Sequence, residues 1–401
     1  MKTVPPFEIH FLSVIQLYKN MCFTLVLGIS SNAFKGNHMN TRIKFSRRVT
    51  LAGILLANSV TAFADEPSTR PEVTSPPLVL KERGSFIVGG ESKAMTASQL
   101  SSIFGTPPAS GGNVTVNQMY VEFMVPENET GIPVVMLHGA TLSGMTYDTT
   151  PDGRMGWYEY FVRQGYPVYI PDQVSRGRSG ADYSVYGDVR SGHVSPDKLP
   201  NVFRISDQLG WTMFRFGPTY GQAFEDEKFP THAAREFSQQ AVADLNGGLP
   251  TPNPNFKTMS GLAEKLKGAV LLGHSESGTV PLDAAMVSMK GIKGLVLVEP
   301  GGCRADTWTD AQLASLSKVP VLAVFGDHLD VNTGTRGFSW MDAYRDCDKL
   351  IGRLKKAGGN AQMLHLPERQ VYGNSHMMMM DINNLQVADL LIDWMKKNVK
   401  N

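Results

Sequence analysis

Short apolar runs recur along the chain, and runs of this kind are typical of strands buried on both faces of a parallel sheet. Most are separated by segments long enough for a crossover helix, which predicts a mostly parallel α/β sheet with flanking helices. The runs are Val134–Leu137, Val168–Ile170, Ala269–Leu272, Leu295–Val298, Val321–Phe325 and Met363–Leu366.

The pattern changes on either side of these runs. Between Val114 and Val125 apolar and polar residues partly alternate, as in antiparallel strands with one face in water, so the sheet is predicted to start there. In the segment Leu385–Val399 apolar residues recur near helical spacing. This predicts a final helix that packs on the sheet.

The segment from about 182 to 256, between the second and third runs, is far longer than a crossover needs. Its aromatic side chains are dense enough for a packed structure, and we expect a lid that shapes an apolar pocket over an active site. The alternative is a peripheral decoration with its own small core. The aromatics are Tyr183, Tyr186, Phe203, Trp211, Phe214, Phe216, Tyr220 and Phe224.

Residues 1–64 have the composition of a leader. Met39 opens a basic stretch, an apolar run over Val49–Ala57 and a small-residue site ending at Ala64, which predicts a secretory signal peptide cleaved after Ala64. We expect Met39 to be the true start and the mature protein to be periplasmic or secreted, without a stable membrane anchor. The pair Arg47–Arg48 fits both the general and the twin-arginine export routes.

After the leader, residues 65–80 are rich in Pro, Ser, Thr and charge and are predicted to be a flexible approach to one catalytic domain over 81–401. Seven of the 38 Lys and Arg but only one of the 37 Asp and Glu lie in the leader, so the remainder is slightly acidic and no nucleic-acid partner is expected. Cys303 and Cys347 also remain, and either one disulfide or two buried thiols fits.

The strongest chemical signal is the segment Val270–Gly278, in which a buried strand runs into a turn of small residues and then an apolar helix starting near Thr279. A sharp turn of this kind holds Ser275 above the sheet edge as a nucleophile, with a helix N-terminus that favours developing negative charge. The usual motif has Gly two residues after the nucleophile, whereas Ser277 occupies that position here.

A second strand ends in His138-Gly139-Ala140, where a loop can bind an oxyanion. The backbone N–H groups of Ala140 and Glu276 are predicted to form the oxyanion hole, with Thr141 in place of Ala140 if the loop is shifted by one residue. His138 precedes the nucleophile in the chain, and we expect its ring to brace the loop rather than to act as the base.

His376 follows the last predicted strand in a loop, which is the expected position of a general base. Glu299 ends an apolar strand before a Gly-rich loop, where a charge is costly without a partner, so we favour it as the orienting acid. Asp327 and Asp330, which follow the next strand, are the alternatives.

Together, His138-Gly139, Gly273 to Gly278, Glu299-Pro300 and Asn374 to His376 resemble a group of bacterial exported esterases of the α/β-hydrolase superfamily that have a Ser-Glu-His triad. The resemblance covers the chain from about Val114 onward. It implies an α/β-hydrolase fold and hydrolysis of a small-molecule carboxylic ester, with the acid after the sixth strand.

Other chemistries remain open at this stage. The same triad serves lactonases, thioesterases and peptidases, and a catalytically silent hydrolase scaffold could act as a binding protein. The sequence has no Cys/His cluster with metal-ligand spacing, so we expect neither a metal nor an organic cofactor.

Overall fold

The computed structural model describes residues 76–100 and 106–400. The predicted leader, with its start at Met39 and its cleavage site at Ala64, lies outside these residues. Within them, none of the helices is long and apolar enough to cross a bilayer.

An eight-stranded sheet forms the centre of the fold, in the order β1-β2-β4-β3-β5-β6-β7-β8. β1 and β2 pair antiparallel, β2 also pairs antiparallel with β4, and all the other pairs are parallel. The mostly parallel α/β sheet expected from the apolar runs is therefore present. Its strands are β1 (Leu80–Met95), β2 (Gly112–Pro126), β3 (Val134–Leu137), β4 (Val168–Pro171), β5 (Ala269–His274), β6 (Ile292–Val298), β7 (Val321–Phe325) and β8 (Ala361–His365).

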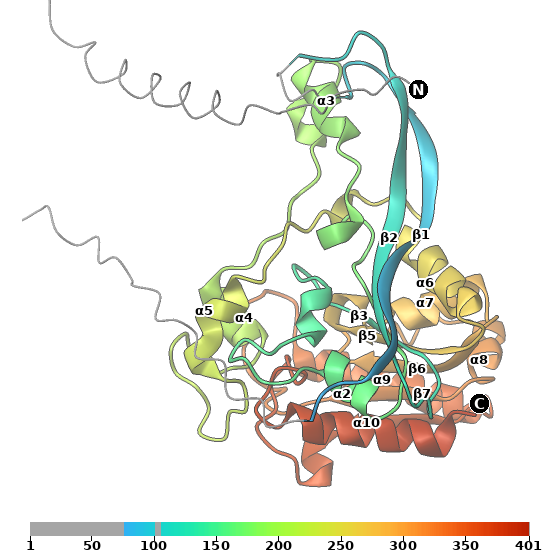
Figure 1. Ribbon diagram of the computed structural model, residues 1–401. Coiled ribbons are helices and arrows are strands. Elements are labelled where there is room, and N and C mark those ends of the chain that lie inside the picture. The colour runs from blue at the N-terminus through green and yellow to red at the C-terminus, as the bar shows by residue number, and fades with distance from the viewer. Residues whose placement is uncertain (1–75, 101–105, 401) are drawn as a thin grey trace, which may run out of the picture. The chain divides into compact units, whose positions relative to one another are not determined.

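The predicted start of the sheet near Val114 was wrong, because β1 begins at Leu80 and pairs with β2 along its whole length. Most β1 side chains are exposed, so the strand lacks the apolar pattern that marks the others. Figure 1 shows this hairpin running beyond the sheet, with α3 (Ser184–Arg190) beside its far end. Lys93 of β1 donates to Asp182 at 2.5 Å and to Ser184 at 2.9 Å and joins the two.

The central parallel strands β5, β6 and β7 are buried on both faces, since helices cover the sheet on each side (Figure 1). On one face α2 (Trp157–Arg163) and α10 (Asn384–Asn398) pack against alternate strand residues such as Val270 and Leu272. On the other face α6 (Pro254–Lys265), α7 (Val280–Val287), α8 (Asp310–Leu316) and α9 (Trp340–Lys356) pack against the intervening residues, such as Leu271 and Leu295. Burying each Leu or Val side chain stabilises the fold by about 1.5–3 kcal/mol, which makes these two layers the main source of stability.

Some helices pack on the sheet and others belong to the inserted segment. Between β4 and α6 the inserted segment forms α3, α4 and α5, joined by long irregular stretches. The helices are α2 (Trp157–Arg163), α4 (Asp207–Met213), α5 (Ala234–Ser238), α6 (Pro254–Lys265), α7 (Val280–Val287), α8 (Asp310–Leu316), α9 (Trp340–Lys356) and α10 (Asn384–Asn398). The last corresponds to the final helix expected over Leu385–Val399.

Cys303 and Cys347 form a disulfide, the first of the two states that the sequence left open. It links the loop after β6 to α9. In the same place the Asp346 carboxylate accepts hydrogen bonds from the backbone N–H groups of Cys303, Arg304 and Ala305 at 2.6–3.0 Å. The loop that follows Glu299 is therefore held on α9 by a covalent bond and by three hydrogen bonds.

Candidate active site

Ser275 lies at the turn between β5 and α7, at the carboxyl end of the parallel strands, where ligand sites of such sheets are found. Its φ of 58° is in the left-handed region, which is costly for a residue with a side chain and marks a strained turn. Close neighbours require glycine around it: a Cβ on Gly273 would lie 2.1 Å from the Ser277 carbonyl oxygen, and one on Gly139 would lie 2.7 Å from the Ser275 Cβ.

Ser277 replaces the usual glycine without loss of the turn. Its buried hydroxyl accepts from the His274 N–H at 3.1 Å and donates to the Leu137 carbonyl oxygen at 2.9 Å, so it ties β5 to β3. Glycine is needed one residue later, since a Cβ on Gly278 would lie 2.6 Å from Pro300. The position at which only glycine fits is thus one residue later than in the usual motif, at Gly278 instead of at 277.

His376 lies in the loop after β8 and contacts the other two predicted residues. Its Nδ1 is 3.2 Å from Glu299 Oε2 and its Nε2 is 2.9 Å from Ser275 Oγ. Because a carboxylate only accepts hydrogen bonds, Nδ1 carries the proton and Nε2 is left to accept from the serine hydroxyl. The ring stacks on Phe214, with centroids 5.6 Å apart and planes at 3°, and also packs against Trp340, with centroids 4.2 Å apart.

Glu299 directly follows β6, is fully buried and has a φ of 48°. Its carboxylate accepts from His376, from the Gly326 N–H at 2.5 Å and from both terminal nitrogens of Arg215 at 2.6 and 2.8 Å. The alternative acids lie elsewhere: the Asp327 carboxylate accepts from backbone N–H groups of His328 and Gly373, and Asp330 is exposed. Of the three candidates, Glu299 is the one in contact with His376.

Burial and charge set the ionisation of these groups. Burial opposes ionisation of Glu299, but Arg215 and the hydrogen bonds from His376 and Arg215 outweigh it and lower the pKa of the carboxyl to about 2. Burial also lowers the pKa of His376; Glu299 raises it and Arg215 lowers it further. At neutral pH the pair is thus an ionised carboxylate and a neutral imidazole.

The loop after β3 carries Ala140 and Thr141 beside the nucleophile turn. The Thr141 N–H donates to the Asp244 carboxylate at 3.0 Å, and the Thr141 carbonyl oxygen accepts from the Val242 N–H at 2.8 Å. The Thr141 N–H is thus engaged in binding the inserted segment, which favours Ala140 as the donor to an oxyanion. Asp244 pairs in turn with the buried Arg176.

Arg176 extends this network to the other side of the loop, where it donates to the Gly139 carbonyl oxygen at 2.9 Å and to Glu276 Oε2 at 3.1 Å. His138 lies in the same place. Its Nδ1 donates to the Gly139 carbonyl oxygen at 2.9 Å, and its Nε2 accepts from the Gln173 N–H at 3.0 Å. His138 therefore braces the loop, and it has no contact with Ser275 among the hydrogen bonds of the described residues.

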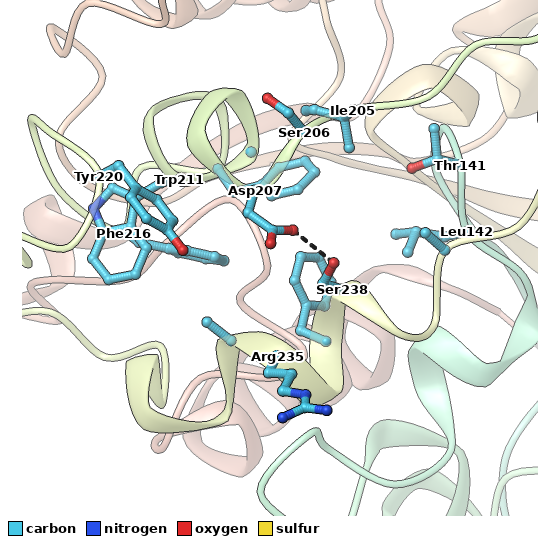
Figure 2. Close-up of a pocket in the computed structure, with 15 residues that line it drawn as sticks. Thr141, Leu142, Ile205, Ser206, Asp207, Trp211, Phe216, Tyr220, Arg235 and Ser238 are labelled. Atoms are coloured by element: carbon cyan, nitrogen blue, oxygen red, sulfur yellow. Dashed lines mark hydrogen bonds between the residues drawn. The ribbon is translucent and has the colours of Figure 1, made fainter. Parts of the chain in front are cut away.

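A largely apolar pocket lies between the inserted segment and the loop after β3. Its walls include Trp211, Phe214, Phe216 and Phe237 of the inserted segment and Leu142. Figure 2 shows Trp211, Phe216 and Tyr220 gathered on one side and Leu142 on the other; the Asp207 carboxylate accepts from the Ser238 hydroxyl at 2.7 Å between them. Phe214 also stacks on His376, so one wall of the pocket contacts the ring of that histidine.

Comparison with known proteins places this geometry in a family. No family model matches the chain. The solved structure of a novel bacterial esterase, however, is 44% identical in sequence, with a TM-score of 0.75, over 82% of this chain and 99% of its own. The chain belongs to the α/β-hydrolase esterases. The probable secreted lipase phiG of Fungal sp. (strain ATCC 74256) is 27% identical over 332 residues, which are 72% of this chain and 88% of that protein.

One group of side chains in the described part of the esterase could hold a metal ion. Ligand atoms of Asp226, Asp327 and His328 lie within 4.8 Å of one another. His328 Nε2 already lies 2.9 Å from Asp226 Oδ1, and Phe224 stacks on the His328 ring. These contacts are enough to explain the group as a link between the inserted segment and the loop after β7.

Sequence reasoning missed the residues that support the site from outside the motifs. Arg215 and Asp244 belong to no recognised motif and come from the inserted segment, and Arg176 lies in the Gly-rich loop after β4, to which no role in the site was assigned. Arg215 did leave one signal, because it is a single charge between Phe214 and Phe216. A charge in an aromatic run is costly without a buried partner, by the same argument that selected Glu299.

Proposed function

We propose that this esterase cleaves carboxylic esters by a two-step acyl transfer with Ser275 as nucleophile. His376 takes the hydroxyl proton at Nε2 as Ser275 Oγ attacks the ester carbonyl carbon. The imidazolium then returns that proton to the leaving alcohol oxygen, which leaves the acyl group on Ser275. In the second step water attacks the acyl-enzyme with His376 again as base, and the acid is released.

The observation that carries this proposal is the chain of contacts from Ser275 Oγ through His376 to Glu299, with lengths of 2.9 and 3.2 Å. Both distances allow hydrogen bonds, and the order of the groups matches what an activated serine requires. In this mechanism Glu299 holds the neutral imidazole in the tautomer that accepts from Ser275, and it stabilises the imidazolium when that forms.

The oxyanion of the tetrahedral intermediate is proposed to bind the backbone N–H groups of Ala140 and Glu276. Each such donor contributes roughly 3–4 kcal/mol to transition-state stabilisation. Support comes from the location of both residues beside Ser275, and from the Thr141 N–H being engaged with Asp244. Catalysis in this scheme needs neither a metal nor an organic cofactor.

We further propose that the inserted segment, about 182 to 256, covers the site as a lid and that its aromatic pocket receives an apolar part of the ester. The aromatic walls and the contact of Phe214 with His376 support this role. We also propose that the protein is exported and that its leader is removed after Ala64. The Cys303–Cys347 disulfide supports a location in the periplasm or outside the cell, and the relative named as secreted is consistent with it.

The test is to label the protein with a fluorophosphonate, map the adduct and measure p-nitrophenyl acetate turnover. Ser275→Ala is expected to lose both the label and turnover. Glu299→Gln is expected to lower kcat by at least 100-fold, because the tautomer of His376 is no longer held. Asp330→Asn is the matched control, since its carboxylate is exposed and lies outside these contacts.

A label on another residue would refute Ser275 as the nucleophile. Turnover that survives in Glu299→Gln would refute the assigned acid while leaving the nucleophile in place. Parallel assays with thioesters, lactones and amides of the same acyl group then rank the bonds that this site cleaves. No labelling and no turnover at all would favour the silent scaffold.

A further inference from the structure

Arg215 comes from the inserted segment yet lies at the acid end of the triad. It follows α4, and its side chain is fully buried. Its Nη1 donates to Glu299 Oε2 at 2.8 Å and its Nη2 donates to Glu299 Oε1 at 2.6 Å, which is the two-pronged geometry that a guanidinium makes with a carboxylate. Its Nε donates to the Asp327 carbonyl oxygen at 2.7 Å, so the fork is held at both ends.

With these bonds the hydrogen-bonding capacity of the Glu299 carboxylate is full. Oε1 accepts from Arg215 and from the Gly326 N–H, and Oε2 accepts from Arg215 and from His376. Two carboxylate oxygens offer about four acceptor positions, and all of them are used. The carboxylate therefore cannot rotate about its terminal bond without breaking at least two charge-assisted hydrogen bonds.

The backbone around Arg215 is adapted to this contact. Arg215 has a φ of 62°, in the left-handed region that disfavours residues with a side chain. Strain of this kind persists where the surroundings enforce it, and it gathers at functional sites. Trp340, which packs on the His376 ring, also has its ring 5.3 Å from the Arg215 guanidinium carbon. The Trp340 side chain thus contacts both His376 and Arg215.

We propose that Arg215 is a positioning residue for ester hydrolysis, which holds the Glu299 carboxylate ionised and aimed at His376 Nδ1. This inference rests on the proposed triad and adds a fourth residue to it, supplied by the inserted segment. Arg215 does not touch the ester; it acts through Glu299. Because the bond to Glu299 joins the inserted segment to the end of β6, the acid is in its working orientation only when that segment is folded against the sheet.

The charged groups around Glu299 and His376 determine how the acid limb of the pH profile changes when Arg215 is removed. His376 must be neutral to accept a proton, and its lowered pKa places the acid limb of kcat/KM below the ordinary value of 6.5. Glu299 favours the imidazolium and Arg215 opposes it. His274, Glu227, Asp381 and Asp327 also lie near these groups. Loss of the Arg215 charge therefore moves the acid limb to higher pH.

The experiment compares Arg215→Met, which removes the charge and the fork at similar size, with Arg215→Lys, which keeps the charge. Rates are expressed per active site counted with the fluorophosphonate, so that unfolded protein does not enter. We expect Arg215→Met to lower kcat up to roughly 100-fold, since a small misplacement near the reacting groups costs that much. Its acid limb moves to higher pH, whereas Arg215→Lys loses less rate and keeps the limb near that of the wild type.

Arg154→Met is the control for a general loss of packing near the His376 loop, because Arg154 donates to the Met380 and Asp381 carbonyl oxygens outside the triad. It is expected to lower the melting temperature without moving the acid limb. An equal shift in Arg154→Met, or unchanged kcat and pH limb in Arg215→Met, overturns the proposal. If Arg215→Met does not fold, Arg215→Lys with wild-type kcat overturns it. Activity retained in Glu299→Gln refutes the triad instead, which separates the two failures.

Discussion

Single residues around Ser275 are constrained by space more than by chemistry. The turn brings the backbone of Gly139, Gly273 and Gly278 so close to neighbouring groups that a methyl group on any of them would overlap another atom. In protein interiors such overlaps are relieved by shifting the backbone, which costs about 1–3 kcal/mol. At this site the same shift also moves Ser275, the proposed nucleophile.

Gly139→Ala should therefore impair catalysis. The added Cβ would lie 2.7 Å from the Ser275 Cβ and 3.1 Å from His274 Nδ1, so Ser275 or the loop after β3 must move. We expect kcat to fall by roughly 100-fold. Gly261→Ala is the control: a Cβ there meets nothing within 4 Å, and in helix α6 it should raise stability by roughly 0.5–1 kcal/mol. Equal kcat in the two variants would show that the contact at Gly139 is not limiting.

The residues of the proposed triad were within reach of sequence reasoning because each follows a strand that the apolar pattern marks. Ser275, Glu299 and His376 were predicted as a set, and their side chains are in contact. The partner of Arg215, 84 positions away, was out of reach because no strand or motif marks the position of Arg215 relative to the sheet. Long-range charge pairs of this kind are set by the tertiary structure.

Elements differ in how far their sequences predict them. The parallel strands were found because burial on both faces makes them continuously apolar, and their predicted bounds agree with the structure to within a few residues. β1 was missed because its side chains are mostly exposed, and its pairing with β2 arises from backbone hydrogen bonds. The inserted segment was recognised by its length and aromatic content, whereas its contacts with Glu299 and Thr141 were not.

The pocket between α4 and α5 leads to a prediction about the length of the acyl chain that the esterase accepts. Ala234 of α5 lines it and no residue of the proposed triad does, so Ala234→Trp takes up space in the pocket. We expect turnover of p-nitrophenyl octanoate to fall by roughly tenfold or more while turnover of the acetate stays near the wild-type rate, because only the longer chain needs the pocket. Ala311→Trp in α8 is the control, since the Ala311 side chain is exposed and is not among the residues that line the pocket. If both esters are affected equally, the apolar part of the substrate binds elsewhere.

At the scale of the whole molecule, two helical layers and one disulfide hold the sheet. The disulfide closes a loop between residues 44 positions apart and pins the chain that follows Glu299 to α9. Cross-linking a loop of that length restricts the unfolded chain and stabilises the folded state by about 4 kcal/mol.

Replacing both cysteines in Cys303→Ala/Cys347→Ala should lower the free energy of unfolding by that amount, measured by urea denaturation. Added dithiothreitol should lower the melting temperature of the wild type and leave that of the double variant unchanged. Activity per active site at room temperature should be close to that of the wild type, because the Asp346 hydrogen bonds still hold the loop. A double variant as stable as the wild type would show that these bonds and the core suffice.

Two of the contacts that the inserted segment makes with the core have a consequence for engineering. Arg215 holds the acid and Asp244 holds the loop after β3, so a graft that replaces the whole segment to change substrate range would also remove both supports. Libraries that randomise the stretch between Arg215 and Asp244, while these two residues stay fixed, would vary the pocket walls. The contacts of Arg215 with Glu299 and of Asp244 with Thr141 would be kept. This esterase is thus divided into a region open to redesign and two anchor points that must be inherited intact.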